Sequence, residues 1–209
     1  MRIGILGGTF DPVHLGHLIV AEEVRIKLGL SKILFIPAGQ PWLKLNHSIS
    51  PATHRVEMVR RAIASNPYFE LCTLEVERSG PSYTVDTIAA LRDQLGRQSF
   101  FFLLGSDTLA GLHLWKEPAK LAQMCQLAVV PRVGLSLPDL NSLEASIPGV
   151  IDRVIQLDVP IIDISSSDIR QYVAQGRSIH YLVPDEVERY IAEQKLYRHD
   201  KAWGGKTDS

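Results

Sequence analysis

The sequence predicts an α/β protein built on one doubly wound, mostly parallel β-sheet, with further helices at the C-terminal end. Short apolar runs alternate with helical patterns through most of the 209 residues. Such alternation is typical of βαβ units, whose parallel sheet is covered by helices on both faces. The first run, 2–7, is apolar almost throughout, which predicts a central strand buried on both sides.

The expected elements follow one another in order along the chain. Strands are expected at 2–7, 32–37, 69–77, 99–104, 127–130 and 154–157. Helices are expected at 15–28, 51–64, 83–95, 117–124, 138–146, 166–174 and 184–197. In the second helix Val56, Val59 and Ile63 have one-face helical spacing. We expect residues 1–198 to form a single domain and residues 199–209 to form a flexible polar tail.

Composition and charge exclude several classes of function. Lys and Arg number 22 against 23 Asp and Glu, so no bulk positive field favours nucleic acid. No apolar run approaches the roughly 20 residues of a membrane span, and no signal-peptide pattern is seen. Cys72 and Cys125 have no metal or redox spacing, which favours core residues of a reducing compartment. We therefore expect a cytoplasmic protein without nucleic-acid or membrane partners; a homo-oligomer stays open.

The turn after the first strand is the first candidate site. In an open parallel sheet, ligands bind outside the carboxyl ends of the strands, where strand order reverses. Gly7 and Gly8 follow the strand directly and would let backbone N–H groups approach a phosphate closely. A plain strand-to-helix turn would also explain two glycines. The Gly-x-Gly-x-x-Gly turn of a dinucleotide-binding dehydrogenase is absent, which argues against that class.

Two histidines strengthen the case for phosphate binding at this turn. His14 and His17 are three residues apart, on one side of the first turn of the next helix. Unpaired N–H groups and partial positive charge gather there. Imidazoles can donate to phosphate oxygens and, if protonated, can offset charge on a leaving group. A metal pair would need a third ligand, which the sequence does not show; structural core histidines are the other alternative.

A second candidate phosphate element lies at 164–170, with the sequence ISSSDIR. Ser165 can cap a helix, and Asp168 can reach back in the manner of a capping box. Capping alone does not require three hydroxyls followed by an arginine. Ser167 and Arg170 lie three apart at the positive end of the helix, which is a good arrangement for holding an anion.

At its His-x-Gly-His segment the sequence resembles the Rossmann-like nucleotidyltransferases, and the wider stretch 7–17 is similar to that of nicotinate-mononucleotide adenylyltransferases. Residues 164–170 resemble the family's Ile-Ser-Ser-Thr-x-x-Arg motif, with Ser167 in place of the usual Thr. Similar motifs run in order from Gly4 to Tyr197. The resemblance implies catalytic roles for His14, His17 and Arg170. It implies ATP binding by Gly7, Gly8, Thr9, Phe10, His14, His17, Ser165, Ser167 and Arg170.

The resemblance also suggests where the acceptor binds. Residues 78–87, RSGPSYTVDT, resemble the family's pyridine-mononucleotide specificity segment. This similarity implies that Tyr83 and Thr84 hold the nicotinate carboxylate, chiefly through backbone N–H groups. After the fourth strand, the Asp107 carboxylate could accept from ribose hydroxyls. Trp115 offers a flat face for a pyridine ring, and core packing is its alternative role.

One loop departs from the family pattern. The family often has Pro-Pro-His-Lys after the second strand, where this chain has Pro-Trp-Leu-Lys at 41–44. Lys44 can still contact a phosphate, or it is a solvated loop lysine.

The reaction that the resemblance implies is ATP plus nicotinate mononucleotide giving deamido-NAD and pyrophosphate. Mg²⁺ is expected on the triphosphate, held largely by phosphates and water rather than by a dedicated protein cage. Two alternatives stay open. One is a sister adenylyltransferase that uses nicotinamide mononucleotide or another phosphorylated acceptor. The other is a nucleotide-binding module without catalysis.

Overall fold

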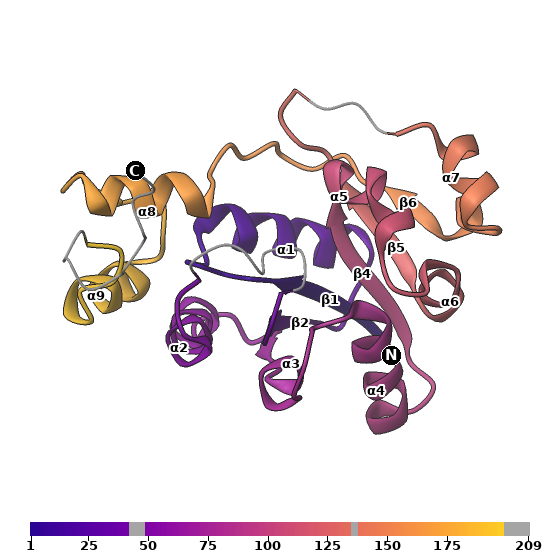
Figure 1. Ribbon diagram of the computed structural model, residues 1–209, viewed down its shortest axis with the longest axis horizontal. Coiled ribbons are helices and arrows are strands. Elements are labelled where there is room, and N and C mark those ends of the chain that lie inside the picture. The colour runs from indigo at the N-terminus through magenta and orange to yellow at the C-terminus, as the bar shows by residue number, and fades with distance from the viewer. Residues whose placement is uncertain (42–48, 135–137, 199–209) are drawn as a thin grey trace, which may run out of the picture.

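The computed structural model describes residues 1–41, 49–134 and 138–198. In these residues six parallel strands form one sheet in the order β3-β2-β1-β4-β5-β6, with helices on both sides (Figure 1). The strands are β1 (Arg2–Gly8), β2 (Lys32–Pro37), β3 (Phe69–Leu71), β4 (Ser99–Gly105), β5 (Gln126–Val130) and β6 (Val154–Gln156). The predicted doubly wound parallel sheet is confirmed.

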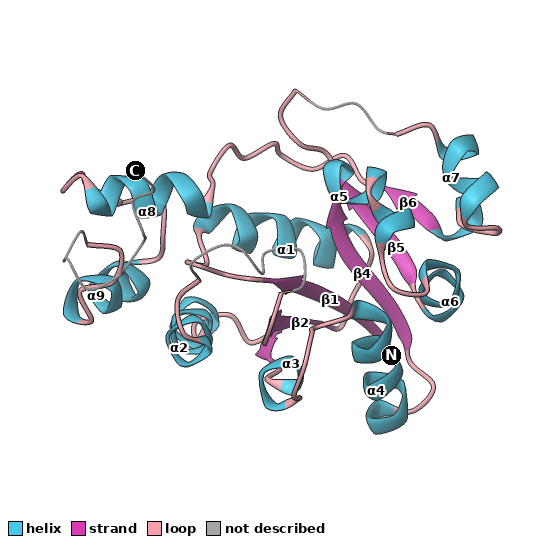
Figure 2. Ribbon diagram, in the orientation of Figure 1, coloured by secondary structure: helices cyan, strands magenta, loops and turns pink. Residues whose placement is uncertain are grey.

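Strand order reverses at β1, which lies between β2 and β4 at the centre of the sheet (Figure 2). Ile5 pairs with Leu34 of β2 on one side and with Phe102 of β4 on the other. From β1 the chain builds outward to β2 and β3, then crosses back to β4 and builds outward to β5 and β6. The carboxyl ends of β1 and β4 therefore flank the crevice where a doubly wound sheet binds its ligands.

The helices agree with most of the expected ranges. They are α1 (Leu15–Lys27), α2 (Ala52–Ile63), α3 (Leu74–Glu77), α4 (Thr84–Leu95), α5 (Ser106–Ala110), α6 (Pro118–Met124), α7 (Leu140–Ser146), α8 (Ser166–Ala174) and α9 (Asp185–Glu193). The short helix α5 and two 3₁₀ turns, Leu112–Leu114 and Ile151–Arg153, were not expected from the sequence.

Two expected boundaries are wrong. The strand expected at 69–77 ends at Leu71, and α3 follows it because the N–H groups of Val76 and Glu77 donate to the Thr73 carbonyl instead of to a neighbouring strand. The last helix ends at Glu193 rather than at residue 197. Lys195 and Tyr197 have φ angles of 53° and 64°, a left-handed conformation that does not continue a helix.

Alternation along the strands divides the core into two clusters, one on each face of the sheet. Phe100, Phe102 and Leu104 of β4 pack with α4 and α6. Phe101 and Leu103 point the other way and pack with α1, α2 and α9. The sheet is thus covered on both faces, as its continuous apolar strands predict.

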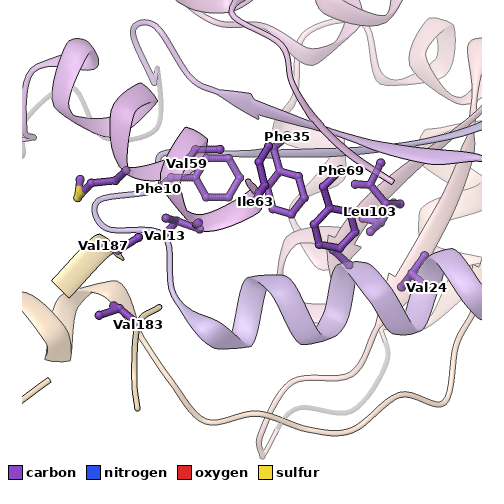
Figure 3. Packing of buried hydrophobic residues seen from close by; sticks show 14 of the residues in the cluster. Phe10, Val13, Val24, Phe35, Val59, Ile63, Phe69, Leu103, Val183 and Val187 are labelled. Atoms are coloured by element: carbon purple, nitrogen blue, oxygen red, sulfur yellow. The ribbon is translucent and has the colours of Figure 1, made fainter. Parts of the chain in front are cut away.

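An aromatic row anchors the loop that follows β1. The ring centroids of Phe10 and Phe35 are 5.9 Å apart, and those of Phe35 and Phe69 are 5.0 Å apart (Figure 3). Phe10 is buried, although its φ of 51° is uncommon for a residue other than glycine. Burial of this large ring fixes the position of the loop on which the candidate site is built.

Both cysteines are free thiols. Cys125 is buried, as expected, and burial raises its pKa to about 12, whereas Cys72 is half-buried against the same cluster. In the part of the chain that is described, no helix is long and apolar enough to cross a membrane. The expected polar tail at 199–209 and the Lys44 loop lie outside the described residues.

Candidate active site

His14 and His17 stand at the start of α1 with their rings stacked. The ring centroids are 3.6 Å apart and the planes differ by 28°. His17 Nδ1 accepts a hydrogen bond from the His14 backbone N–H at 3.2 Å. Because Nδ1 is an acceptor, the hydrogen of the neutral His17 ring lies on Nε2. His17 can therefore donate to a phosphate without being charged.

The glycine between the two histidines has a steric role. A Cβ atom at Gly16 would lie 3.1 Å from His14 Nδ1 and 3.3 Å from Ile162 Cγ2. Both distances are tighter than ordinary contacts, so a side chain here would displace the His14 ring or the segment before α8. The His-x-Gly-His spacing therefore lets the first histidine fold back over the start of its own helix.

His14 is a buried and electrostatically unusual group. Its residue is 5% exposed, and its Nδ1 atom is buried without a hydrogen-bond partner in the described part of the chain. Burial, followed by the positive charge of Arg132, lowers the His14 pKa from 6.5 to about 4. Without ligand the ring is thus neutral at pH 7. The protonated imidazole that the sequence left open is therefore not the form of His14 in the protein without ligand.

The start of α8 docks on the loop after β1 and so joins the two candidate phosphate elements. Arg170 Nη1 donates to the Asp11 carbonyl at 2.7 Å, and Arg170 Nη2 donates to Ser167 Oγ at 3.2 Å. Ser166 Oγ donates to the Pro12 carbonyl at 2.8 Å. Residues more than 150 positions apart in the sequence therefore border the same loop.

The predicted cap of α8 is present. Ser165 Oγ accepts from the Asp168 N–H at 3.1 Å and donates to Asp168 Oδ2 at 2.7 Å. The Asp168 carboxylate thus bonds the capping hydroxyl itself. Ser165 is engaged within the helix end, whereas Arg170 reaches the loop and also donates to Ser167.

The first N–H group of α1 is not free for a ligand. The Leu15 N–H donates to the Leu182 carbonyl at 2.9 Å, so the segment that leads into α9 closes over the helix start. The unpaired N–H groups expected at this helix start therefore do not include that of Leu15.

A cavity of about 160 Å³ lies beside the loop, at the carboxyl ends of β1 and β2. Of the predicted site residues it is lined by Gly7, Gly8, Thr9, Thr84 and Trp115. Its size is comparable to the roughly 150 Å³ engineered cavity that binds benzene in another protein. The cavity therefore fits one aromatic ring.

Trp115 packs in the core and also borders the cavity. It packs edge-on against Phe102, with ring centroids 5.8 Å apart and planes at 78°. It also lines the cavity. Core packing therefore fixes the orientation of the indole that borders the cavity.

The start of α4 forms another wall of the cavity. Tyr83 is the residue before its first turn, and the Tyr83 carbonyl accepts from the N–H groups of Asp86 and Thr87. Thr84 is the first helical residue and lines the cavity. By helix geometry the N–H groups of Thr84 and Val85 have no partner inside the helix, and the helix start carries partial positive charge. A carboxylate in the cavity would find its donors here.

Three other predicted site residues have surroundings that the sequence did not show. The Phe10 side chain is in the core and contacts the His17 ring edge-on at 5.1 Å between centroids, so only its backbone can bind ATP. Asp107 is exposed at the start of α5, and its Oδ1 is 3.7 Å from Arg132 Nε, so it does not line the cavity. Tyr83 is half-buried, with Lys116 Nζ 4.8 Å from its ring centroid.

Sequence reasoning missed the buried arginine that holds the loops around the cavity. Arg55 is 2% exposed. Its Nε donates to the Ser50 carbonyl at 2.9 Å, its Nη1 to the Thr9 carbonyl at 2.9 Å and its Nη2 to the Gly39 carbonyl at 3.3 Å. Its position three residues before buried Met58 and four before buried Val59 places it on the apolar face of α2, a signal the sequence contains.

Asp11 was also missed as a structural group of this loop. Asp11 Oδ1 accepts from the Tyr197 hydroxyl at 2.6 Å, and Asp11 Oδ2 accepts from the Ser50 N–H at 3.1 Å. Burial and the neighbouring Asp11 raise the Tyr197 pKa well above its ordinary value, so Tyr197 remains the proton donor. The loop is thereby tied to the end of the described chain.

The fold and site define a doubly wound α/β protein with two imidazoles and an arginine around the loop after β1. Residues 5–172 match the model of the cytidylyltransferase-like family. The chain is 45% identical to a "Probable nicotinate-nucleotide adenylyltransferase" of Dehalococcoides mccartyi (strain ATCC BAA-2266), over 94% of this chain and 97% of the relative. It is 47% identical to one of Thermomicrobium roseum, over 94% and 92%. The chain belongs to the nicotinate-nucleotide adenylyltransferase family.

Solved structures agree on the fold. Nicotinic acid mononucleotide adenylyltransferase of Plasmodium falciparum, complexed with NaAD, superposes with a TM-score of 0.77 at 22% identity, over 94% of this chain and 97% of that chain. The same protein complexed with APC gives a TM-score of 0.75.

Proposed function

We propose that this chain transfers the adenylyl group of ATP to nicotinate mononucleotide and releases deamido-NAD and pyrophosphate, a step in NAD biosynthesis. One observation carries the proposal: α8 docks on the loop of the two histidines, directly beside a cavity that fits one aromatic ring. Phosphate-binding groups and a ring-binding cavity thus share one loop. The names of the relatives support the same activity.

The reaction is an in-line displacement at the α-phosphorus of ATP. An oxygen of the mononucleotide phosphate forms the new bond to this phosphorus. The bond to the oxygen that bridges the α- and β-phosphates breaks, and its electron pair leaves with pyrophosphate. Positioning and charge stabilisation carry such transfers, so the protein needs no covalent nucleophile.

A neutral imidazole and a charged guanidinium both donate hydrogen bonds to the triphosphate. His17 Nε2–H and Arg170 donate to phosphate oxygens, with Ser167 beside the arginine. Ser165 supports this group by capping α8, and the backbone of Gly7, Gly8, Thr9 and Phe10 lies along the phosphates. These donors stabilise the charge that builds on the leaving pyrophosphate.

His14 couples ATP binding to a proton. Its pKa of about 4 reflects burial and a cationic neighbour. The negative charge of a bound triphosphate would oppose the effect of both on the pKa. Anionic phosphate near the ring favours the imidazolium. We therefore expect ATP binding to raise the His14 pKa and to be accompanied by proton uptake near neutral pH.

The acceptor places its pyridine ring in the cavity against Trp115. Its carboxylate lies at the start of α4, where the N–H groups near Tyr83 and Thr84 donate to it. An amide in the same place would turn its NH₂ group toward these donors and leave them unpaired, which strongly disfavours the wrong ligand. Asp107 accepts from a ribose hydroxyl, and Lys44 contacts a phosphate.

Mg²⁺ is proposed as the divalent ion of the reaction, bound to the triphosphate. In the part of the chain that is described, His180, Asp185 and Glu188 are the group of three side chains that could hold a metal ion, and the first two are exposed. None belongs to the loop after β1 or to the start of α8. The phosphates and water therefore hold the ion, which neutralises phosphate charge.

The redox state of the cysteines bears on the location in the cell. We keep the cytoplasm as the proposed location, because both thiols are free as in a reducing compartment. The proposed partners are ATP and nicotinate mononucleotide.

Pyrophosphate release tests the function. The protein is assayed with MgATP and either nicotinate mononucleotide, nicotinamide mononucleotide or no acceptor. We expect release with the acid and at least about tenfold lower kcat/KM with the amide. Equal use of both would support the sister activity on nicotinamide mononucleotide. ATP binding without release with any acceptor would leave only a nucleotide-binding module.

A further inference from the structure

A buried carboxyl group in the cavity wall has no part in the chemistry described above. Glu75, in the short helix α3, is 8% exposed and lines the cavity. Its backbone packs closely against Gly39, which follows β2 (the β2 exit): a Cβ atom at Gly39 would lie 2.1 Å from the Glu75 carbonyl oxygen. The position of Glu75 is therefore fixed by close backbone packing.

The Glu75 carboxyl is bonded to a hydroxyl of α4. Glu75 Oε1 accepts from Thr87 Oγ at 2.7 Å. Thr87 Oγ itself accepts from Arg78 Nη2 at 3.1 Å. A hydroxyl has one hydrogen, and the shorter contact to Glu75 takes it in preference to the Tyr83 carbonyl at 3.2 Å.

A second hydroxyl approaches Glu75 from the other end of the same turn. Ser82 Oγ accepts from the N–H groups of Gly39 at 2.9 Å and Gln40 at 3.2 Å. Both of its lone pairs are used, which leaves its hydrogen for another acceptor, and Ser82 is one of the neighbours that oppose the rise of the Glu75 pKa. Ser82 thus links the β2 exit to the start of α4.

The two hydroxyls lie on either side of the N–H groups assigned to the acceptor. Ser82 comes just before Tyr83, and Thr87 lies one turn into α4. Between them are Thr84 and Val85, whose N–H groups precede the first intrahelical bonds. The hydrogen bond between Glu75 and Thr87 therefore joins α3 to the first turns of α4, where these two N–H groups lie.

We propose that Glu75 is a positioning residue for the acceptor: by holding Thr87 of the first turns of α4, its carboxyl group aims the N–H groups near Tyr83 and Thr84 at the nicotinate carboxylate. The inference rests on the proposed function. Burial raises the Glu75 pKa, while the hydroxyls of Thr87 and Ser82 and then the charge of Arg78 oppose that shift. Glu75 acts through the helix start and needs no contact with substrate.

The test compares Glu75→Gln with Glu77→Gln, which alters an exposed carboxylate of the same helix. KM values for nicotinate mononucleotide and for ATP are measured separately, together with kcat, the acid-over-amide ratio and the melting temperature. For Glu75→Gln we expect KM for the acid to rise about 10- to 100-fold, the range for losing a hydrogen bond to a charged group. KM for ATP should stay within about twofold, and the acid-over-amide ratio should fall. Glu77→Gln should match the wild type in each quantity.

A second pair of variants separates positioning from folding. Thr87→Val removes the hydroxyl at nearly constant shape, and Thr87→Ser keeps it. We expect the valine variant to raise KM for the acid and the serine variant to restore it. A lower melting temperature with unchanged KM for the acid, or an equal rise of both KM values, would overturn the proposal. Wild-type protein that does not use the acid would instead refute the proposed function.

Discussion

Replacement of Arg55 by methionine removes the group that holds three loops around the cavity. Methionine keeps a long, unbranched side chain at this buried position and takes away all the donors. The carbonyls of Thr9, Gly39 and Ser50 would each lose a hydrogen bond. Asp11 would lose the positive charge that interacts with it in the interior.

The expected loss of stability follows from these contacts. A buried carbonyl left unsatisfied costs about 1–3 kcal/mol. Part of this is recovered, because burial lowers the Arg55 pKa, which means that the buried charge carries a desolvation penalty that methionine does not have. We expect a net loss of about 3 kcal/mol in the free energy of unfolding, the low end of the range for breaking a buried charge interaction.

Urea unfolding followed by tryptophan fluorescence measures this loss. With an m value of about 2 kcal/mol/M, the midpoint should fall by about 1.5 M. Arg60→Met is the matched control, since this side chain of α2 is 58% exposed and bonds Glu57 at the surface. The control should change stability by less than about 0.5 kcal/mol. A loss below about 1 kcal/mol for Arg55→Met would refute the idea that the three carbonyls depend on this residue.

Three further predictions concern the site. The His14 pKa is 6.5 in the unfolded chain and about 4 in the folded protein, so the unfolded chain binds more protons between these pH values. Between pH 7.5 and pH 5 the wild type should therefore lose about 2 kcal/mol more free energy of unfolding than His14→Gln. Urea unfolding at several pH values measures this, and an equal pH dependence of stability in the two proteins would contradict it. Gly39→Ala should raise KM for nicotinate mononucleotide or prevent folding, because its Cβ atom would lie 2.1 Å from the Glu75 carbonyl oxygen. Gly111→Ala is the control, since its Cβ atom would have its nearest contact at 3.8 Å, and it should match the wild type in acceptor kinetics and melting temperature. His17→Ala should lower kcat about 10²–10³-fold in steady-state assays, and an unchanged kcat with weaker ATP binding would remove His17 from the chemistry.

Local pattern was enough to predict the sheet and most of its helices. The β1 and β4 runs are apolar on both faces, and that property belongs to the residues themselves. The interpretation failed at 69–77, where Leu74 to Glu77 alternate as a strand would. Glu75 there points inward to Thr87 instead of outward to solvent, and only the packing of α3 on the Gly39 loop decides that.

The sequence by itself determined the class of site: an imidazole pair at a helix start, and a hydroxyl–arginine pair at another. Their meeting, the burial that lowers the His14 pKa, and the Arg55 and Glu75 hydrogen bonds were decided by the tertiary structure alone. The physical reason is the separation along the sequence of the residues that interact. Helix and strand periodicity depends on neighbours a few residues apart, whereas burial and hydrogen bonds between distant segments exist only after the sheet has brought those segments together.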